Sequence, residues 1–399
     1  MPATAASAYP APGVPDARAR PLAAARFGGG WEGAAVMMLT LLLLSFGLVT
    51  LYSASSFLAQ RQGLPDYYFV VRQAVGAGVG LMFLLIFSRI PYNRWQSLAW
   101  PMMLAAWLLL VFIVLPGTES FAPERNGARR WLQVGPVGFQ PSEAAKLAIL
   151  VWTAVLAVKK QDRFRSLTRG LGPFLLIWAA MLVPVLLEPD FSTAALIAML
   201  GCIIVFAAGA RVGHFVFLGL LATPAILYQF AADFRFRRLI VFLNPGSHTT
   251  GAGYQVDQSL IAIGSGGIGG VGFGEGQQKF GFLPEAHNDF IFALIGEEWG
   301  LIGVALLVCA YVALIVIGFR IARRAADLLG ELLAVGCTSL IALHAFLHMG
   351  VNLSLLPATG LPLPLISDGR SNLVITLAAI GILMSVARGI PHNPRPSHD

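Results

Sequence analysis

Charge is scarce in this sequence. Asp, Glu, Lys and Arg make up only 12% of its 399 residues, whereas hydrophobic residues make up 57%. A soluble domain typically carries about 25% charged residues, and the mean hydropathy of this chain is +0.73. The composition excludes an ordinary soluble domain and indicates a membrane protein that crosses the bilayer several times.

Cysteine is scarce as well, and acidic residues are outnumbered. The three cysteines, Cys202, Cys309 and Cys337, lie in apolar runs without pairing or metal-ligand spacing, which argues against a disulfide framework or a zinc site. The 27 Lys and Arg against 20 Asp and Glu give a formal net charge of +7. In a membrane protein this excess indicates basic cytosolic loops facing anionic lipid. We therefore expect membrane lipid, and no nucleic acid, among the partners.

About ten apolar segments are present, each near the ~20 residues that a helix needs to span a bilayer. We expect them near 34–54, 68–88, 97–116, 142–158, 171–187, 191–209, 213–231, 289–318, 330–355 and 371–388. Residues 1–33, rich in Ala, Pro and Gly, predict a disordered cytosolic tail, and no signal-peptide cleavage site stands out. The prediction is an all-α polytopic membrane domain over 34–388 and a cytosolic C-terminal tail over 389–399.

The short loops predict the orientation, because cytosolic loops are enriched in Lys and Arg. With the N-terminus inside, the cytosolic set comprises Arg89, Arg94, Lys159, Lys160, Arg163, Arg165, Arg169, Arg211, Arg320, Arg323, Arg324 and Arg388. An even number of spans then places both termini in the cytosol. Two long outer loops, about 117–141 and 232–288, are Gly-rich and basic. Long ordered loops are usually functional, and basic residues on the outer face suggest an anionic ligand.

The stretch KFGFLPEAHNDFIF, residues 279–292, concentrates charge at the mouth of an apolar segment. It contains Lys279, Glu285, His287 and Asp289, and charge at a membrane edge is costly and usually functional. Asp289 alone could cap the following helix and interact favourably with the helix dipole. That interpretation does not account for Glu285 and His287.

Two acidic residues, Glu297 and Glu298, follow about two turns further along the same span. At least one should face the interior of the bundle, because lipid exposure would cost a few kcal/mol. Glu297 is balanced between a structural role, paired with an Arg or with backbone amides, and a functional one.

A second constellation comprises NGARRW at 126–131 and QPSEAAKL at 140–147. Pro141, Ser142 and Glu143 predict a helix start. Glu143 and Lys146 are i,i+3 and share a helix face, so they could simply pair. His344 and His348 are i,i+4 in a later span. Without a third ligand, hydrogen-bonded histidines are favoured over a metal site.

Two further motifs have ordinary structural interpretations. FRFRR at 234–238 alternates aromatics with arginines, as an interfacial segment does. GSGGIG at 264–269 matches G-x-G-x-x-G, but no βαβ unit surrounds it, so we reject a dinucleotide site. We expect these glycines to allow a tight turn or a close approach to the membrane surface.

Five motifs, in order, resemble those of the SEDS family (shape, elongation, division and sporulation), the FtsW/RodA/SpoVE group. The LPEAHND stretch resembles the family signature LPEAHxD, and 126–147 resembles NGxxRW…QPSExxKL. Residues 234–245 resemble YRxRRxxxFxNP, and the N-terminal stretches YSAS at 52–55 and YFVVRQ at 68–73 also fit. Residues 357–372 resemble PxTGxPLPxISYGGSS, with Asp368, Arg370 and Asn372 in place of tyrosine, glycine and serine. Asp368 and Arg370 are candidates for a local pair.

The resemblance implies a peptidoglycan glycosyltransferase that polymerises lipid II at the outer face of the bacterial cytoplasmic membrane. It implies that Asp289 is the catalytic base. It implies substrate-binding roles for Arg129, Arg130, Lys146, Arg237, Arg238, Lys279, Glu285 and His287, and supporting roles for Glu143, Glu297 and Ser367. Arg129 or Arg130 is favoured at the pyrophosphate, where guanidinium groups bind bidentately. No metal ligands are predicted and no cofactor is assigned, although a divalent cation is left open.

The resemblance also implies a partner, a class B penicillin-binding protein that supplies the transpeptidase, together with other divisome proteins. The stretch QKF…LPEAHND and the N-terminal tail are more similar to the FtsW (division) branch than to the RodA (elongation) branch. The alternatives are a lipid II flippase or other lipid transporter, since broken helices and intramembrane charges suit transporters equally, and a division scaffold. The clustering of candidate residues on the outer side favours the polymerase.

Overall fold

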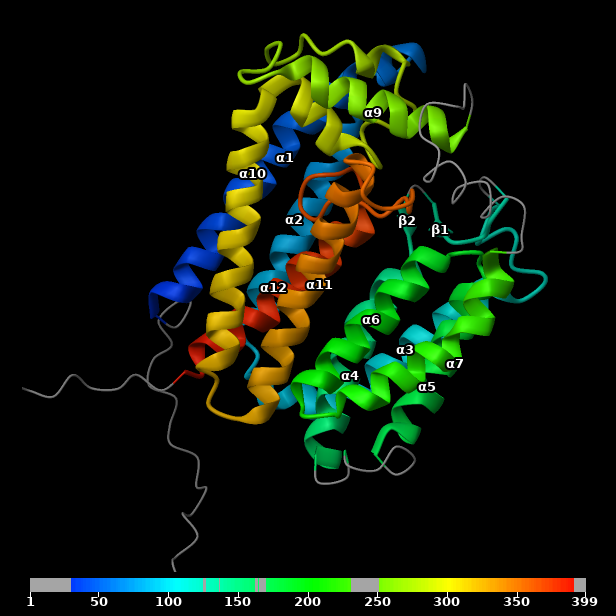
Figure 1. Ribbon diagram of the computed structural model, residues 1–399, viewed down its shortest axis with the longest axis vertical. Coiled ribbons are helices and arrows are strands. Elements are labelled where there is room, and N and C mark those ends of the chain that lie inside the picture. The colour runs from blue at the N-terminus through cyan, green and yellow to red at the C-terminus, as the bar shows by residue number, and fades with distance from the viewer. Residues whose placement is uncertain are drawn as a thin grey trace, which may run out of the picture.

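The protein is almost entirely helical, as shown by a computed structural model that describes residues 30–124, 127–135, 137–161, 164, 170–230 and 251–390 (Figure 1). The first helices are α1 (Gly30–Arg61), α2 (Tyr68–Arg89), α3 (Trp95–Val114), α4 (Pro141–Lys160), α5 (Gly172–Leu187), α6 (Phe191–Ala207) and α7 (Val212–Phe230). They are followed by α9 (Ala252–Gly266), α10 (Ile291–Arg323), α11 (Leu328–Asn352) and α12 (Arg370–Arg388), with short 3-10 turns η1 (Tyr92–Arg94) and η4 (Gln278–Phe280).

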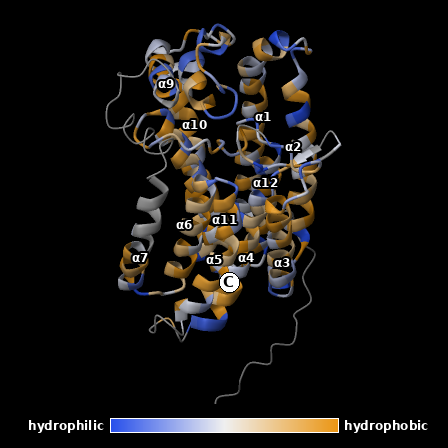
Figure 2. Ribbon diagram, turned by 90° about the vertical axis from the view of Figure 1, so that its right-hand side faces the viewer, coloured by the Kyte–Doolittle hydropathy of each residue, from blue (hydrophilic) through white to orange (hydrophobic). Residues whose placement is uncertain are grey.

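Every apolar segment predicted from the sequence forms a helix. In the part of the chain described, seven helices are long and apolar enough to cross a membrane, namely α1, α2, α3 with η1, α4, α10, α11 and α12. The apolar helices α5 and α6 are shorter, at 16 and 17 residues. Figure 2 shows hydrophobic residues along the lengths of the helices and hydrophilic residues mainly toward their two ends. The polytopic membrane prediction is confirmed.

Helix boundaries follow from local sequence. Pro141 is the first residue of α4, where its missing N–H is not needed. Asp190 caps α6 by accepting a hydrogen bond from the Thr193 backbone N–H at 3.2 Å, and Asp327 caps α11 by accepting from that of Gly330 at 2.8 Å. Each cap supplies a partner to a helix N-terminus that otherwise lacks one.

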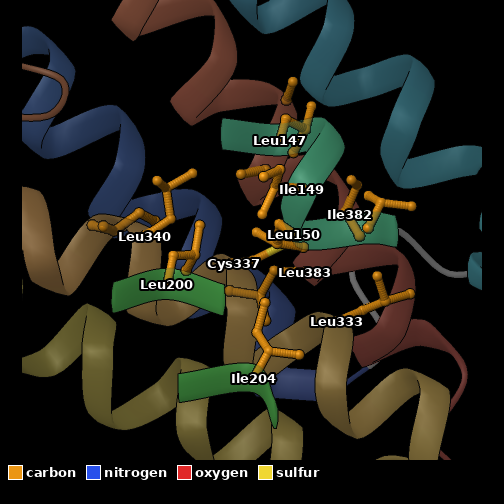
Figure 3. Packing of buried hydrophobic residues seen from close by; sticks show 14 of the residues in the cluster. Leu147, Ile149, Leu150, Leu200, Ile204, Leu333, Cys337, Leu340, Ile382 and Leu383 are labelled. Carbon is orange, nitrogen blue, oxygen red and sulfur yellow. The ribbon is translucent and has the colours of Figure 1, made fainter. Parts of the chain in front are cut away.

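The core lies where α4, α6, α11 and α12 meet. Figure 3 shows Leu147, Ile149 and Leu150 of α4 packed among apolar side chains of the other three helices. Gly336 on α11 allows the close approach, because a Cβ there would lie 2.8 Å from Leu150 Cγ. The helices at the periphery of the bundle, α1, α2, α3 and α10, instead expose many large apolar side chains, as expected for surfaces that face lipid.

Two outer regions contain structure that the sequence did not predict. Residues 117–141 include a hairpin of β1 (Leu132–Val134) and β2 (Val137–Phe139), antiparallel with Leu132 opposite Phe139. The all-α prediction is otherwise confirmed. Helix α9 lies in the region predicted as a long loop, and its last residue, Gly266, packs on α10. A Cβ at Gly266 would overlap the carbonyl oxygen of Gly296.

The GSGGIG stretch therefore serves helix packing. Residues 266–270 lie along α10 at the point where that helix is kinked at Gly300, whose φ is +64°. The backbone N–H of Gly270 lies so near Gly300 that a Cβ on Gly300 could not fit. The glycines provide a close backbone approach, here to a neighbouring helix.

Candidate active site

The Asp289 segment is a run of tight turns that precedes α10. Glu285 has φ +55°, and its carbonyl accepts the backbone N–H groups of Asn288 at 3.1 Å and Asp289 at 2.9 Å. Asn352, the last residue of α11, donates to the Asp289 carbonyl at 3.1 Å and accepts from the Ala293 N–H at 3.1 Å. The N-cap position of α10 is the next residue along, Phe290. Asp289 thus lies one residue before the N-cap.

The loop between α11 and α12 packs against this segment. Ser367 Oγ donates to the Asn288 carbonyl at 2.7 Å and accepts from the Leu363 N–H at 2.9 Å. Gly360, with φ +68°, lies beside the Asp289 carboxylate, since an added Cβ would be 3.4 Å from Asp289 Oδ2. Glycine thus lets the loop backbone approach the carboxylate. Ser367, predicted to have a supporting role, joins the two segments directly.

His287 and Glu285 lie on the same turn segment as Asp289. The His287 ring is half-buried, with its centroid 5.4 Å from that of Phe69 on α2. Its carbonyl accepts the backbone N–H of Asp368 at 3.2 Å. Glu285 is exposed. The predicted site residues Glu285, His287 and Asp289 thus lie within five consecutive positions just before α10.

Lys146 lies at the centre of a buried polar network. Its Nζ donates to Glu143 Oε1 at 2.7 Å and lies 3.0 Å from His344 Nε2 on α11. Asn372 on α12 donates to the other oxygen of Glu143 at 3.1 Å. The Lys146 side chain is 0% exposed. The predicted pairing of Glu143 with Lys146 is confirmed, while the binding of pyrophosphate by Lys146 stays a prediction.

His348 is also hydrogen-bonded, as predicted. Its Nδ1 lies 2.8 Å from the Leu361 carbonyl, in the same loop as Gly360. Among the described residues, no group of three or more His, Cys, Asp and Glu is arranged to hold a metal ion. The two histidines connect α11 to α4 and to the loop beside Asp289.

Lys279 belongs to a second buried network, which joins residues 274–279 to α1 and α10. Its Nζ donates to Glu298 Oε1 at 2.8 Å, to Ser53 Oγ at 2.9 Å and to the Gly274 carbonyl at 2.5 Å. Glu297 accepts the backbone N–H of Gln277 at 2.8 Å. Both glutamates are buried, which confirms that they face inward, and Glu297 is bound to backbone amides as one interpretation proposed.

Arg129 and Arg130 flank the start of the hairpin. Arg129 Nη1 donates to Glu119 Oε1 at 3.0 Å, with 34% of the Arg129 side chain and 62% of the Glu119 side chain exposed. Arg130 donates to the carbonyls of Glu188, at 2.9 Å, and Pro189, at 2.6 Å. Arg130 is thus bound to the turn between α5 and α6. Arg237 and Arg238 lie outside the described residues.

The turn between α5 and α6 was missed as part of the site. Gln140 Nε2 donates to Asp190 Oδ2 at 3.3 Å, and its backbone N–H donates to Ser371 Oγ at 3.0 Å. Burial, with a smaller effect of the nearby Asp190, raises the pKa of Glu188 to about 9, while Arg130 opposes the shift. A Glu-Pro-Asp turn between two apolar segments was the available signal. Only the fold shows that this turn meets Arg130 and Gln140, the residues on either side of the hairpin.

These features define a class of protein, a polytopic helical membrane protein with a carboxylate, Asp289, on a turn segment beside α10 and two buried lysine–glutamate ion pairs. The profile of the FtsW/RodA/SpoVE family, described as cell cycle proteins, matches residues 34–390. This chain belongs to that family, which confirms the resemblance seen in its motifs.

Individual relatives cover most of the chain. It is 38% identical over 360 residues to a protein of Geobacter metallireducens named "Probable peptidoglycan glycosyltransferase FtsW", covering 90% of this chain and 95% of that one. It is 38% identical over 355 residues to stage V sporulation protein E of Bacillus subtilis, covering 88% of this chain and 96% of that one.

Solved structures share the fold. One chain, from work titled "Structural coordination of polymerization and crosslinking by a peptidoglycan synthase complex", superposes with a TM-score of 0.73 at 27% identity, covering 90% of this chain and 98% of that one. The rod shape determining protein RodA of Thermus thermophilus superposes with a TM-score of 0.66 at 27% identity, covering 93% and 99%.

Proposed function

We propose that this protein is a peptidoglycan glycosyltransferase that polymerises lipid II at the outer face of the cytoplasmic membrane. The observation that carries the proposal is the Asp289 segment. Hydrogen bonds from Asn352 and Ser367 hold the backbone around Asp289, and Gly360 leaves room beside its carboxylate. The relatives named as peptidoglycan glycosyltransferases, at 38% identity over most of both chains, support the same activity.

The chemistry suits a carboxylate held in this way. A sugar hydroxyl of one lipid-linked chain attacks the anomeric carbon of another, and Asp289 takes the hydroxyl proton. The bond from that carbon to the pyrophosphate breaks as the new glycosidic bond forms, so a single direct step inverts the anomeric configuration. The departing lipid pyrophosphate gains negative charge, which cations near the outer ends of the helices would stabilise.

The candidate cations differ in how available they are. Lys146 and Lys279 are buried in ion pairs, so they would act from within the bundle. Arg129 is partly exposed, and its partner Glu119 is more exposed still. An exposed ion pair contributes only about 0–1 kcal/mol, so Arg129 can exchange Glu119 for a phosphate at low cost. Arg129 is therefore the best candidate for first contact with the donor.

We place both termini in the cytosol. The C-terminal ends of α4 and α10 carry Lys159, Lys160, Arg320, Arg323 and Arg324. Glu32, near the start of α1, forms ion pairs with Arg320 and Arg324 at the end of α10. The start of α1 and the end of α10 therefore share one face, and its basic residues indicate the cytosolic side.

For the partner, we propose a class B penicillin-binding protein that crosslinks the glycan made here, acting with other divisome proteins in septal synthesis. The synthase complex named above couples polymerisation to crosslinking. Relatives named FtsW favour division over elongation.

The test is polymerisation by purified protein with lipid II and the cognate class B transpeptidase. Asp289→Asn keeps the shape of the side chain and removes its basicity. We expect normal expression and no glycan from the variant. Labelled lipid II in sealed vesicles separates the alternatives, since a polymerase should not move label between leaflets. Leaflet exchange by both proteins, with glycan from neither, would instead establish a flippase.

A further inference from the structure

Asp368 is anchored between α2 and the Asp289 segment. Gln73 on α2 donates to the Ser367 carbonyl at 2.8 Å and accepts from the Gly369 N–H at 3.4 Å, so it bonds to both neighbours of Asp368. The backbone N–H of Asp368 donates to the His287 carbonyl at 3.2 Å. These bonds fix the position from which the Asp368 carboxylate acts.

Basic groups from three different elements lie near Asp368, namely His287, whose carbonyl accepts the Asp368 N–H, Arg72 beside Gln73, and Arg370 two residues further along. Burial raises the pKa of Asp368, whereas His287, Arg72 and Arg370, in that order, lower it, and Glu285 opposes them. Arg72 precedes Gln73 on α2 and donates to the Tyr68 hydroxyl at 3.1 Å. Arg370 begins α12 and packs along α2, where a Cβ on Gly76 would lie 3.1 Å from Arg370 Cγ. Asp368 is the only acidic residue in the described stretch 353–369 of this loop.

We propose that Asp368 is a positioning residue whose carboxylate is the shared counter-charge for His287, Arg72 and Arg370, and that it thereby holds the segment carrying Asp289 in its reactive place. The inference rests on the proposed polymerase function. Without the carboxylate, the positive charges of Arg72 and Arg370 would lack their counter-charge in a partly buried site, where repulsion is stronger than in water. His287 is two residues from Asp289, so its displacement would move the base. A misplacement of about 1 Å can cost on the order of 100-fold in rate.

The kinetic test removes the charge and keeps the shape. Asp368→Asn should lower kcat for glycan synthesis about tenfold or more, whereas the apparent KM for lipid II should stay the same or fall, because the remaining cations still attract the anionic donor. Asp368→Glu should recover most of kcat. Arg72→Gln removes one of the positive charges and so relieves the repulsion. The kcat of the double variant, Asp368→Asn with Arg72→Gln, should therefore fall by less than the product of the two single fold-losses. Arg61→Gln, which removes an exposed cation on the outer side, is the matched control and should leave kcat unchanged.

A double-mutant cycle measured in Tm tests the charge cluster without an activity assay. The Tm values of wild type, Asp368→Asn, Arg72→Gln and the double variant are compared in the absence of lipid II. Non-additive Tm shifts together with non-multiplicative kcat losses support the proposal. The effects of substitutions at independent sites multiply to within about twofold. Independent effects on both kcat and Tm would overturn the shared counter-charge.

Two other outcomes are also decisive. Coupled Tm shifts with a normal kcat for Asp368→Asn would make the cluster structural and overturn the positioning role. A wild type that makes no glycan with its cognate transpeptidase, but shows coupled Tm shifts, would overturn the role in polymerisation together with the proposed function, while leaving the charge cluster established.

Discussion

Lys146 on α4 and His344 on α11 meet inside the bundle, with Nζ 3.0 Å from Nε2, and Glu143 completes the contact by accepting from the same Nζ at 2.7 Å. An ammonium group buried among apolar helices requires a counter-charge, because transfer of an unpaired charge out of water is very costly. Asn372 in turn holds Glu143. Three helices therefore depend on one buried ion pair.

This arrangement predicts an asymmetry between single and double substitutions. Glu143→Gln leaves Lys146 buried without its counter-charge and should lower the free energy of unfolding by about 3–5 kcal/mol. Glu143→Leu combined with Lys146→Met removes both charges and should cost clearly less. Thermal unfolding of the purified variants is the measurement. Equal losses for the single and the double variant would contradict the ion-pair account.

The exposed pair of Arg129 and Glu119 predicts opposite effects on substrate use. Arg129→Ala should raise the apparent KM for lipid II several-fold, whereas Glu119→Ala should leave it unchanged or lower it, since Arg129 no longer has a competing partner. The rise should shrink at high ionic strength because salt screens exposed charges. Neither variant should change Tm appreciably, as exposed pairs stabilise little. A matching rise in KM for both variants would argue against the donor-contact role.

Gly266 and Gly264 provide a matched pair of alanine substitutions in α9. A Cβ at Gly266 would overlap the backbone of α10, whereas nothing lies within 4 Å of a Cβ at Gly264. Gly266→Ala should therefore destabilise the protein by about 1–3 kcal/mol through overpacking. Gly264→Ala should be neutral or slightly stabilising, since alanine favours helix. Comparison of the two Tm values checks the packing of α9 on α10, and equal shifts would refute it.

Glu188 predicts a pH dependence of stability. Its folded pKa, about 9, is raised above the ordinary carboxyl value near 4.5. The folded state therefore binds more protons between these values, and this group's contribution to stability falls as pH rises from about 4.5 to 9. Glu188→Gln cannot ionise and should lose that dependence. Tm measured from pH 5 to 9 should show a variant that gains on wild type as pH rises, whereas Glu119→Gln should show no such gain.

Much of the fold was predictable because hydropathy is a local property of the chain. The apolar segments near α1 to α7 and α10 to α12 were identified from composition and length alone, since a bilayer imposes nearly the same length on every span. The start of α4 was also predictable, because Pro141 acts through its own backbone geometry. The place of Asp289 at the mouth of α10 follows from the same local reasoning, and its catalytic role stays a prediction.

The tertiary structure decided what the charged residues contact. Lys279 was predicted to be an outer cation, yet it is buried against Glu298 and Ser53, and Ser53 lies more than two hundred positions away in the chain. Likewise, no local pattern connects Asp368 with Arg72, or Gln140 with Asp190. Apolar side chains avoid water whatever their neighbours are, so hydropathy along the sequence is enough to predict where they lie. A buried charge is stabilised by particular partners, and only the packing of the helices brings those partners together.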